Sequence, residues 1–221
     1  MVYIFYCIFA QKIIIMKKFA PLMLASMAFL AVSCSSSEED QNAEVEAVAY
    51  ALDKDASSLK WMGNMGPDYG HEGTVEISEG SLTMKGDEFV EGTFTVDMTS
   101  IKNTDLDEPK ASYLVAHLSG SAPDEEHPAD LFFNVPKYPT VDVKLNSYKD
   151  GKLNVTLTIV GKELTQDIEA KISSDEKGAS IKGDFAINMD PLGIMGFQKN
   201  PEDGSQIGPE IKFSLNVALK K

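Results

Sequence analysis

The sequence contains no arginine: all 20 of its basic residues are lysines, against 34 aspartates and glutamates. Arginine is the side chain best suited to hold a phosphate or carboxylate with two parallel hydrogen bonds, so its absence disfavours recognition of that kind. The net charge of −14 also disfavours nucleic acid as a partner, because the protein and a phosphate backbone would repel each other.

Cysteine is almost as scarce. Cys7 and Cys34 are the two in the chain, and both lie near its N-terminus. The residues after them therefore have no cysteine for a disulfide or a metal site. The three histidines, His71, His117 and His127, have a spacing that matches no metal-binding pattern, so we expect neither a metal ion nor a cofactor.

Motifs for catalysis are also missing. No serine lies in a Gly-x-Ser-x-Gly sequence. Acidic residues are abundant throughout, so Asp97 and Asp190, which stand on or near expected strands, carry no distinct signal for acid–base chemistry. We expect no enzymatic activity.

The N-terminal segment has the features of a secretion signal. Met16-Lys17-Lys18 is a basic start, and an apolar run over 19–32 follows it. This run is too short and wrongly flanked for a helix that spans a membrane. We therefore predict that residues 1–33 are a cleaved signal peptide, with translation beginning at Met1 or at Met16.

Leu30-Ala31-Val32-Ser33-Cys34 resembles the bacterial lipobox, in which the cysteine becomes the lipidated N-terminus after cleavage. The resemblance implies a lipid anchor at Cys34, and an ordinary secretion signal with a chance cysteine is the alternative. Residues 34–49 are acidic and poor in large apolar side chains, which predicts a flexible tether. Without the signal peptide the net charge becomes −17.

Ser37-Glu38-Glu39-Asp40 also resembles the acidic export signal of some surface-exposed bacterial lipoproteins, although a plain solvated spacer explains it equally well. Together these features imply the cell envelope of a Gram-negative bacterium. We expect an outer-membrane lipoprotein that faces either the periplasm or the cell surface.

The remaining residues, 50–221, are enough for one domain with a full core. Residues 92–98 alternate polar and apolar side chains, as a half-buried strand does, and the alternation resumes at 139–145. Between them, residues 107–118 are apolar at positions 111, 114, 115 and 118, which predicts a short amphipathic helix with Pro109 in its first turn. We expect this helix to lie across one end of a sheet.

Short turns join most of the other expected strands. Glu79-Gly80 is expected to turn the chain between strands at 74–78 and 81–84, and Asp150-Gly151 is a strong hairpin signal. Later strands are expected at 163–172 and 211–219. The pattern amounts to about eight strands without a repeating strand–helix–strand rhythm, which excludes a parallel α/β fold.

Two all-β architectures satisfy this pattern, a barrel and a two-sheet sandwich. The residues expected to face inward are apolar, and a barrel of about eight strands is just wide enough to be filled by side chains or to hold one ligand. The candidate lining residues, including three phenylalanines from turns and loops, are Trp61, Val75, Ile77, Phe94, Val96, Met98, Phe132, Phe133, Val143, Leu145, Val155, Leu157, Phe185, Ile187, Phe197, Phe213 and Leu215.

Several of these assignments have alternatives. A solid core without a cavity fits the same alternation. Phe132 and Phe133 either plug the barrel or line it, and Phe197, with Met195, either gates the interior or belongs to a local apolar cluster. His117, near the end of the expected helix, is a candidate to contact a ligand headgroup, and packing or capping is its other role.

Five stretches resemble, in order, motifs of the YceI-like family of lipid- or polyisoprenoid-binding proteins, and together they cover nearly all of the chain after residue 50. They are Trp61-Met62-Gly63 with His71-Glu72-Gly73, residues 92–101, His117-Leu118 with residues 132–140, residues 151–161, and residues 184–187 with 190–194. An insertion at 119–129 separates the two parts of the third motif.

The resemblance implies an eight-stranded antiparallel, lipocalin-like barrel with a short helical excursion between two strands. It further implies a non-enzymatic, lipid-anchored protein that holds a long isoprenoid-like ligand, of quinone or prenyl type, in a tunnel for transport, storage or stress protection. Some relatives pair, so a homodimer is possible. The alternative function is an acidic, surface-exposed interaction module whose barrel is packed and free of ligand.

Overall fold

The computed structural model describes residues 45–64, 70–199 and 206–221. The predicted signal peptide, Cys34 and most of the predicted tether lie outside the described residues. Residues 63–70, whose glycines and proline predict a loop, also lie mostly outside the described residues.

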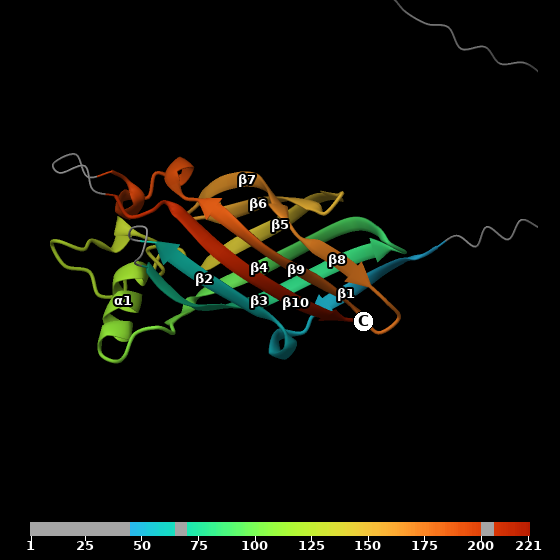
Figure 1. The fold of residues 1–221 in the computed structure, drawn as a ribbon, viewed down its shortest axis with the longest axis horizontal. Coiled ribbons are helices and arrows are strands. Elements are labelled where there is room, and N and C mark those ends of the chain that lie inside the picture. The colour runs from blue at the N-terminus through green and yellow to red at the C-terminus, as the bar shows by residue number, and fades with distance from the viewer. Residues whose placement is uncertain (1–44, 65–69, 200–205) are drawn as a thin grey trace, which may run out of the picture. The chain divides into compact units, whose positions relative to one another are not determined.

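The described residues form ten strands, one α-helix and four short 3-10 helices (Figure 1). The strands are β1 (Ala47–Leu52), β2 (Ser58–Asn64), β3 (Gly70–Lys85), β4 (Glu88–Asn103), β5 (Thr140–Lys149), β6 (Lys152–Ile159), β7 (Lys162–Glu169), β8 (Lys171–Ser174), β9 (Gly178–Asn188) and β10 (Glu210–Lys220). The helices are η1 (Lys54–Ala56), α1 (Lys110–Ser119), η2 (Ala129–Leu131), η3 (Asp190–Leu192) and η4 (Met195–Phe197).

The ten strands make a barrel wall eight strands wide. All pairings are antiparallel, in the order β7-β6-β5-β4-β3-β1-β10-β9-β8, and β2 pairs with both β3 and β10 beyond the end of β1. β1 and β2 are thus two halves of one wall strand, interrupted by η1. β7 pairs with β6, and β8, which follows it directly, pairs with β9, so this second interrupted strand closes the barrel. The predicted closed antiparallel barrel is confirmed and the sandwich is excluded, but the structure has ten strands instead of the predicted eight because two wall strands are interrupted.

The junction between β7 and β9 is closed by a side chain. No ladder pairing joins these two strands in the part of the chain that the structure describes. Gln166 lies on the same alternating face of β7 as the buried Ile168, and its Nε2 donates a hydrogen bond to the carbonyl oxygen of Ala186 at 3.1 Å. One side-chain amide therefore supplies a cross-strand hydrogen bond where the backbone ladder is missing.

The turn expected at Glu79-Gly80 is wrong, because β3 runs through these residues without a break. Its buried positions change from odd numbers, Val75 and Ile77, to even numbers, Leu82 and Met84. The pairing with β4 shifts register between Ile77 and Glu79, as a β-bulge does when one extra residue reverses which side chains face inward. In the sequence, this reversal looks like the end of one strand and the start of another.

Gly80 serves close packing rather than a turn. It pairs with Phe94 on β4, and a Cβ added at Gly80 would lie 2.0 Å from an atom of the Phe94 ring. Likewise, a Cβ added at Gly92 would lie 2.7 Å from Cδ1 of Leu145, its pairing partner on β5. The absence of a side chain at these positions lets large cross-strand neighbours lie over the backbone.

Other boundaries differ modestly from expectation. The helix is present but starts at Lys110, with Pro109 at its N-cap position rather than in its first turn. The strand expected at 163–172 is divided into β7 and β8. Residues 190–209, which are rich in proline and glycine and therefore predict a loop, contain η3 and η4. Among the described residues there is no helix long and apolar enough to cross a membrane.

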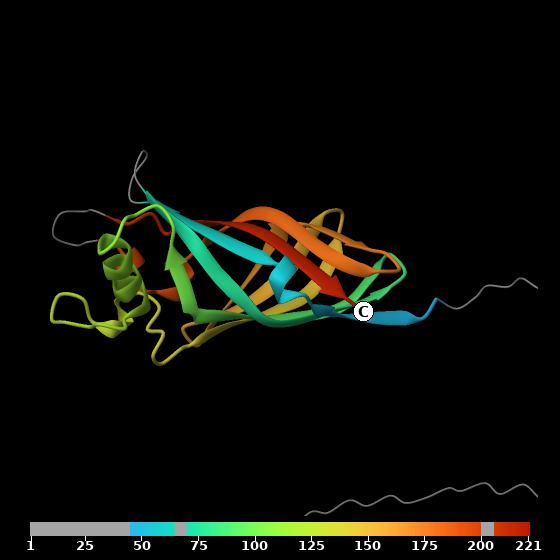
Figure 2. The same cartoon turned by 90° about the horizontal axis from the view of Figure 1, so that it is seen from below.

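α1, η2, η3 and η4 lie at the end of the barrel opposite to the one where β1 begins and β10 finishes (Figures 1 and 2). We call the first the cap end, defined by α1, η2 and η4, and the second the far end. The helix lies across one end of the barrel, as the sequence predicts.

We predict that Gly80→Ala lowers the free energy of unfolding by about 1–3 kcal/mol, because the new methyl group overlaps the Phe94 ring. Urea denaturation measures the change. Gly63→Ala is the matched control: it lies in a strand, and an added Cβ there meets nothing within 4 Å. Equal stability of the two variants would contradict this account of Gly80.

Candidate ligand-binding site

The barrel encloses one apolar cavity of about 260 Å³, close to the lower end of the size range of small-molecule sites. The cavity is lined by residues of β2, β3, β4, β5, β6, β7, β9 and β10, which represent all eight positions of the wall. Residues of α1 and of the segments around η2 and η4 complete the lining. Its side chains are almost entirely aliphatic or aromatic. The cavity therefore suits an apolar guest and offers very few hydrogen bonds to a polar one.

All seventeen candidate lining residues border this cavity, and so does His117. That these residues contact a ligand stays a prediction. The structure adds lining residues that were not predicted as such from the sequence, for example Ile168 and Ile181 on the walls and Leu114 and Leu118 on α1. Alternation along the strands and helical spacing along α1 are the signals that point to them.

Several inward-facing side chains are only half-buried. Val143, Phe185, Phe213 and Leu215 all border the cavity, yet none of them belongs to the fully buried set. In a close-packed interior, side chains on the inner face touch neighbours on all sides. The incomplete burial of these residues indicates an interior that is not filled, which counts against a solid core.

At the cap end, aromatic rings close over the cavity. Phe132 packs edge-on against Phe197, with ring centroids 5.3 Å apart, and Phe133 lies 6.1 Å from the same ring. Phe132 also meets the His117 ring edge-on at 5.0 Å. All four border the cavity, so the phenylalanines both line it and cover its end. Met195, by contrast, is half exposed at 50% and does not border the cavity.

His117 belongs to a second ring contact on the outer side of the cap. Its ring meets that of His127 edge-on at 4.6 Å, and Nδ1 of His127 lies 3.1 Å from Oδ1 of Asp124. Burial lowers the pKa of His117, the neighbouring His127 lowers it further, and the Asp124 carboxylate partly opposes both. His117 is therefore held in its neutral form around pH 7.

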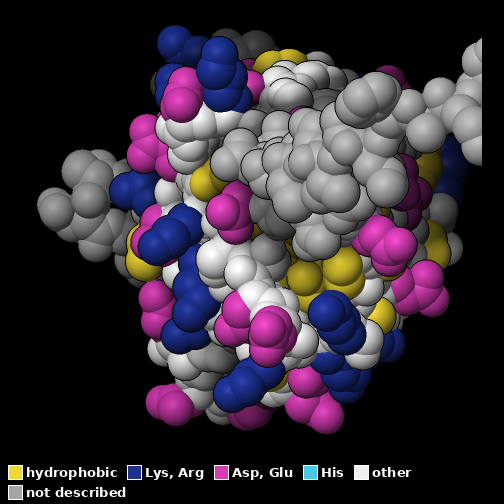
Figure 3. All heavy atoms as spheres, turned by 90° about the vertical axis from the view of Figure 1, so that its right-hand side faces the viewer, with side chains coloured by type: hydrophobic (Ala, Val, Ile, Leu, Met, Phe, Trp, Pro, Cys, Tyr) yellow, Lys and Arg dark blue, Asp and Glu magenta, His cyan; other side chains and the backbone are white. Residues whose placement is uncertain are grey.

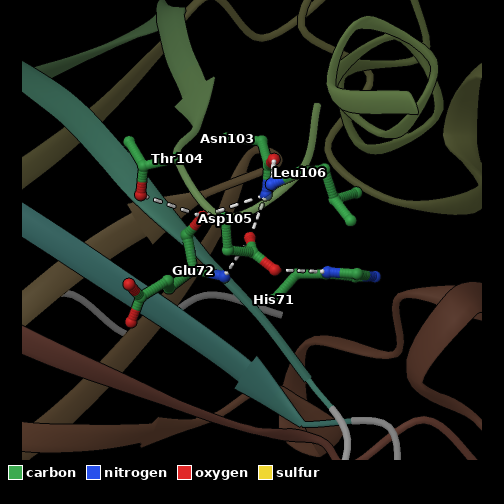
Figure 4. Close-up of polar contacts among 6 residues, drawn as sticks. All are labelled: His71, Glu72, Asn103, Thr104, Asp105 and Leu106. Atoms are coloured by element: carbon green, nitrogen blue, oxygen red, sulfur yellow. Dashed lines mark hydrogen bonds and ion pairs between the residues drawn. The ribbon is translucent and has the colours of Figure 1, made fainter. Parts of the chain in front are cut away.

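His71 is a cavity-bordering residue that we did not select from the sequence. Figure 4 shows its Nδ1 directed at Oδ2 of Asp105, 2.9 Å away. The other carboxylate oxygen accepts hydrogen bonds from the backbone N–H of Glu72 and from the side chain of Asn103. Burial alone would raise the pKa of Asp105, but the hydrogen bonds from His71, Glu72 and Asn103 outweigh it and hold that pKa below its usual value.

The sequence carries a weak signal for His71 and none for Asp105. His71 falls on the same alternating face as Val75 and Ile77, so extending that strand by four residues would have placed it inside. Asp105 is 34 residues further along and follows the end of β4. Only the pairing of β3 with β4 brings the two side chains together.

The polar side chains that border the cavity are Trp61, His71 and His117. The indole N–H of Trp61 donates to the carbonyl oxygen of Thr74 at 3.3 Å, so it is already paired. The two histidines come from segments at the cap end: His71 is the second residue of β3 and is bonded to Asp105, and His117 lies in the last turn of α1. Across the residues that the structure describes, no three His, Cys, Asp or Glu side chains gather to hold a metal ion.

A closed antiparallel barrel around an apolar cavity is the architecture of lipocalin-type binding barrels. The sequence model of the YceI-like domain matches residues 50–219, and the chain therefore belongs to the YceI-like family. Among curated proteins, no sequence match is found.

Two solved structures share the fold. BcnA from Burkholderia cenocepacia is 15% identical, with a TM-score of 0.57 over 76% of this chain and 98% of its own. A polyisoprenoid-binding domain from Saccharophagus degradans, implicated in plant cell wall breakdown, is 13% identical, with a TM-score of 0.55 over 77% of this chain and 97% of its own. At these identities the likeness concerns the fold.

We predict that the protein loses stability in acid partly through His117. Its pKa lies below the ordinary value of 6.5, so the unfolded chain takes up this proton more readily than the folded one. The contribution is complete above about pH 6.5 and is lost as the pH falls from there through the lowered pKa. Urea denaturation across this range checks it.

The matched variant for this experiment is His117→Gln, which keeps a polar side chain but cannot take up the proton. It should show a shallower fall in the free energy of unfolding between about pH 7.5 and about pH 5 than the unmodified protein. All other titrating groups are common to both proteins. Parallel curves would show that His117 does not contribute.

Proposed function

We propose that this protein is a non-enzymatic binding protein for an isoprenoid-like molecule of quinone or prenyl type. The apolar tail occupies the barrel cavity and the polar end lies at the cap end, beside His71 and His117. The observation that carries the proposal is the asymmetry of the cavity: its walls are apolar, and the two histidines in its lining, His71 and His117, both stand at the cap end. Transport, storage and protection of such a molecule are the roles that binding of this kind serves.

The energetics favour a guest that is held by its tail. Each methylene group buried from water contributes roughly 0.8 kcal/mol, so a branched hydrocarbon tail gains considerable affinity without any polar contact. Small-molecule sites typically combine such an apolar surface with a few polar groups that fix orientation. The relative from Saccharophagus degradans, which is described as a polyisoprenoid-binding domain, supports this ligand class.

The charges at the cap end favour an uncharged polar end over a phosphate. Asp105 lies directly behind His71, and Asp124 lies behind His117 through His127. Hydrogen bonds hold the pKa of both carboxyl groups below the usual value, so both are ionised at neutral pH. Arginine, the usual partner of a phosphate, is absent from the whole chain.

The proposal includes attachment to a membrane through Cys34, in the envelope of a Gram-negative bacterium. The lipobox-like residues 30–34 and the acidic stretch that follows support it. β1 begins at the far end of the barrel, so the chain enters the fold at the end opposite α1 (Figure 2). Mass determination of the N-terminal peptide from membrane fractions would identify a lipidated cysteine, or an unmodified one that contradicts the anchor.

The alternative, an acidic interaction module with a packed barrel, has less support because the interior contains a cavity. Pairing into a homodimer is compatible with either function. It stays a prediction, which sedimentation of the purified domain at several concentrations tests.

We predict that Val143→Trp weakens binding of farnesol at least tenfold, because the larger side chain fills the middle of the cavity that Val143 borders. Displacement of a fluorescent apolar probe measures the affinity. Lys144→Trp is the matched control, since Lys144 is the next residue of β5 and is exposed on the outer face. Native mass spectrometry of the gently extracted protein tests for a naturally bound molecule.

A protein that is extracted empty and also refuses farnesol would overturn the proposed function. Equal effects of the two tryptophan substitutions would show that binding, if present, takes place outside the cavity. Thermal unfolding of both variants, measured in parallel, separates loss of binding from loss of the fold.

We further predict that farnesol binds at least tenfold more tightly than farnesyl diphosphate at low ionic strength. Both carry the same tail, so the difference reports on the polar end, and repulsion by Asp105 and Asp124 disfavours the diphosphate. Added salt should narrow the gap by screening this repulsion. Tighter binding of the diphosphate would contradict the assignment of an uncharged end.

A further inference from the structure

On four strands, β3, β5, β9 and β10, the cavity stops before the inward-facing apolar side chains do. On β10, Leu215 and Val217 border it, whereas the next residue on the same face, Leu219, does not. On the neighbouring strand β9, Ile181 borders the cavity and Ala179 does not. The pairing of Val217 with Ile181 and of Leu219 with Ala179 places each boundary at the same height.

Two further strands, β3 and β5, give the same result. On β3, Val75 and Ile77 border the cavity, but Leu82 and Met84 do not, although all four are buried. On β5, Leu145 borders it and Tyr148 does not. On these four strands the inward-facing apolar side chains thus continue towards the far end beyond the cavity, whereas on β6 the cavity reaches Leu153, the pairing partner of Tyr148.

Below that level the interior is densely packed. Leu82 has no exposed surface at all, Met84 is 3% exposed and Leu219 is 4% exposed. Tyr50, which pairs with Leu82 across β1 and β3, is also buried. We call Tyr50, Leu82, Met84 and Leu219 the floor of the cavity.

The bulge in β3 is what places these residues in the floor. Without the register shift after Ile77, the alternation would turn Ser81 and Thr83 inward instead of Leu82 and Met84. Hydroxyl groups directed into an apolar interior would need partners there. The bulge therefore changes a wall that would have become polar into an apolar plug.

Tyrosines at the far end tie the floor to the backbone around it. The Tyr50 hydroxyl donates to the carbonyl oxygen of Asp175 at 3.4 Å, and the backbone N–H of Ile172 donates to the Tyr148 hydroxyl at 3.3 Å. Outside, Figure 3 shows lysine and acidic side chains around a smaller group of hydrophobic side chains on this end of the barrel.

We propose that the floor sets the maximum length of the apolar chain that this protein accepts, so that ligands are selected by length at the far end. This inference rests on the proposed function. With the polar end held at the cap end, a chain that is too long for the cavity can extend neither through the floor nor backwards without moving its polar end away from His71 and His117. Length selection then follows from packed side chains, with no polar contact involved.

The test uses geraniol, farnesol and geranylgeraniol, which share one polar end and increase by one isoprene unit at each step. Leu82→Ala should increase the affinity for geranylgeraniol relative to geraniol at least tenfold. The substitution opens space for about three carbon atoms, and each additional buried methylene is worth about fourfold in affinity. Displacement of a fluorescent apolar probe measures all three ligands.

Two further variants make the test specific. Leu192→Ala removes an equally buried leucine, 1% exposed, from η3, where it does not border the cavity, and should leave the length dependence unchanged. Val217→Leu adds a carbon atom at the deep end and should weaken geranylgeraniol selectively. This second variant keeps the inference testable should Leu82→Ala fail to fold.

An unchanged ratio of the three affinities in both Leu82→Ala and Val217→Leu would overturn the floor as the selector of length while leaving the proposed function standing. A parallel change in Leu192→Ala would likewise overturn it, because the effect would then follow from loss of stability. Failure of the unmodified protein to bind any of the three alcohols would instead overturn the proposed function itself.

Discussion

The structure depends on the closure of a single antiparallel sheet, because closure gives each strand an inner face shielded by all the others. Two wall strands are interrupted, one between β1 and β2 and one between β7 and β8, yet the sheet still closes into a barrel. The interruption between β7 and β8 matters most for closure. The segment that contains these two strands pairs with β6 through β7 and with β9 through β8, and so it joins the two edges of the sheet. Gln166 bridges to β9 where the ladder is missing.

Closure alone does not decide whether the inside is empty. A barrel with about eight strands is at the size where side chains can just fill it. Here both outcomes occur in one molecule: the far end is filled around Leu82, whereas the part nearer α1 is not. Glycines at positions 80 and 92 let Phe94 and Leu145 lie across the backbone, which shapes the middle of the barrel wall.

The two ends of the cavity differ in chemistry as well as in packing. The far end is apolar and tightly packed, so it can discriminate only by shape and size. The cap end combines phenylalanine rings with His71 and His117, each of which has a carboxylate nearby. Orientation of a guest and selection of its length are thus properties of different parts of one barrel.

Most of the strands and their inward-facing residues could be predicted from the sequence, because the alternation of side chains along a strand is a local property. Phe94, Val96 and Met98 share a face through spacing alone, and the structure places all three against the cavity. The same rule failed at Glu79-Gly80, since a bulge and a turn both interrupt alternation and local sequence does not distinguish them. The motifs that resemble the YceI-like family were informative because they occur in order along the whole domain.

The sequence by itself determined the all-β class, the apolar inner faces and the position of the helix, because each follows from the spacing of side chains over a few residues. Only the tertiary structure decided that His71 meets Asp105, that the phenylalanines of η4 and the η2 segment close one end, and that a floor closes the other. These features join residues that are distant in the chain. Their contacts depend on strand register and on the volume left inside the closed barrel, and no local pattern encodes either quantity.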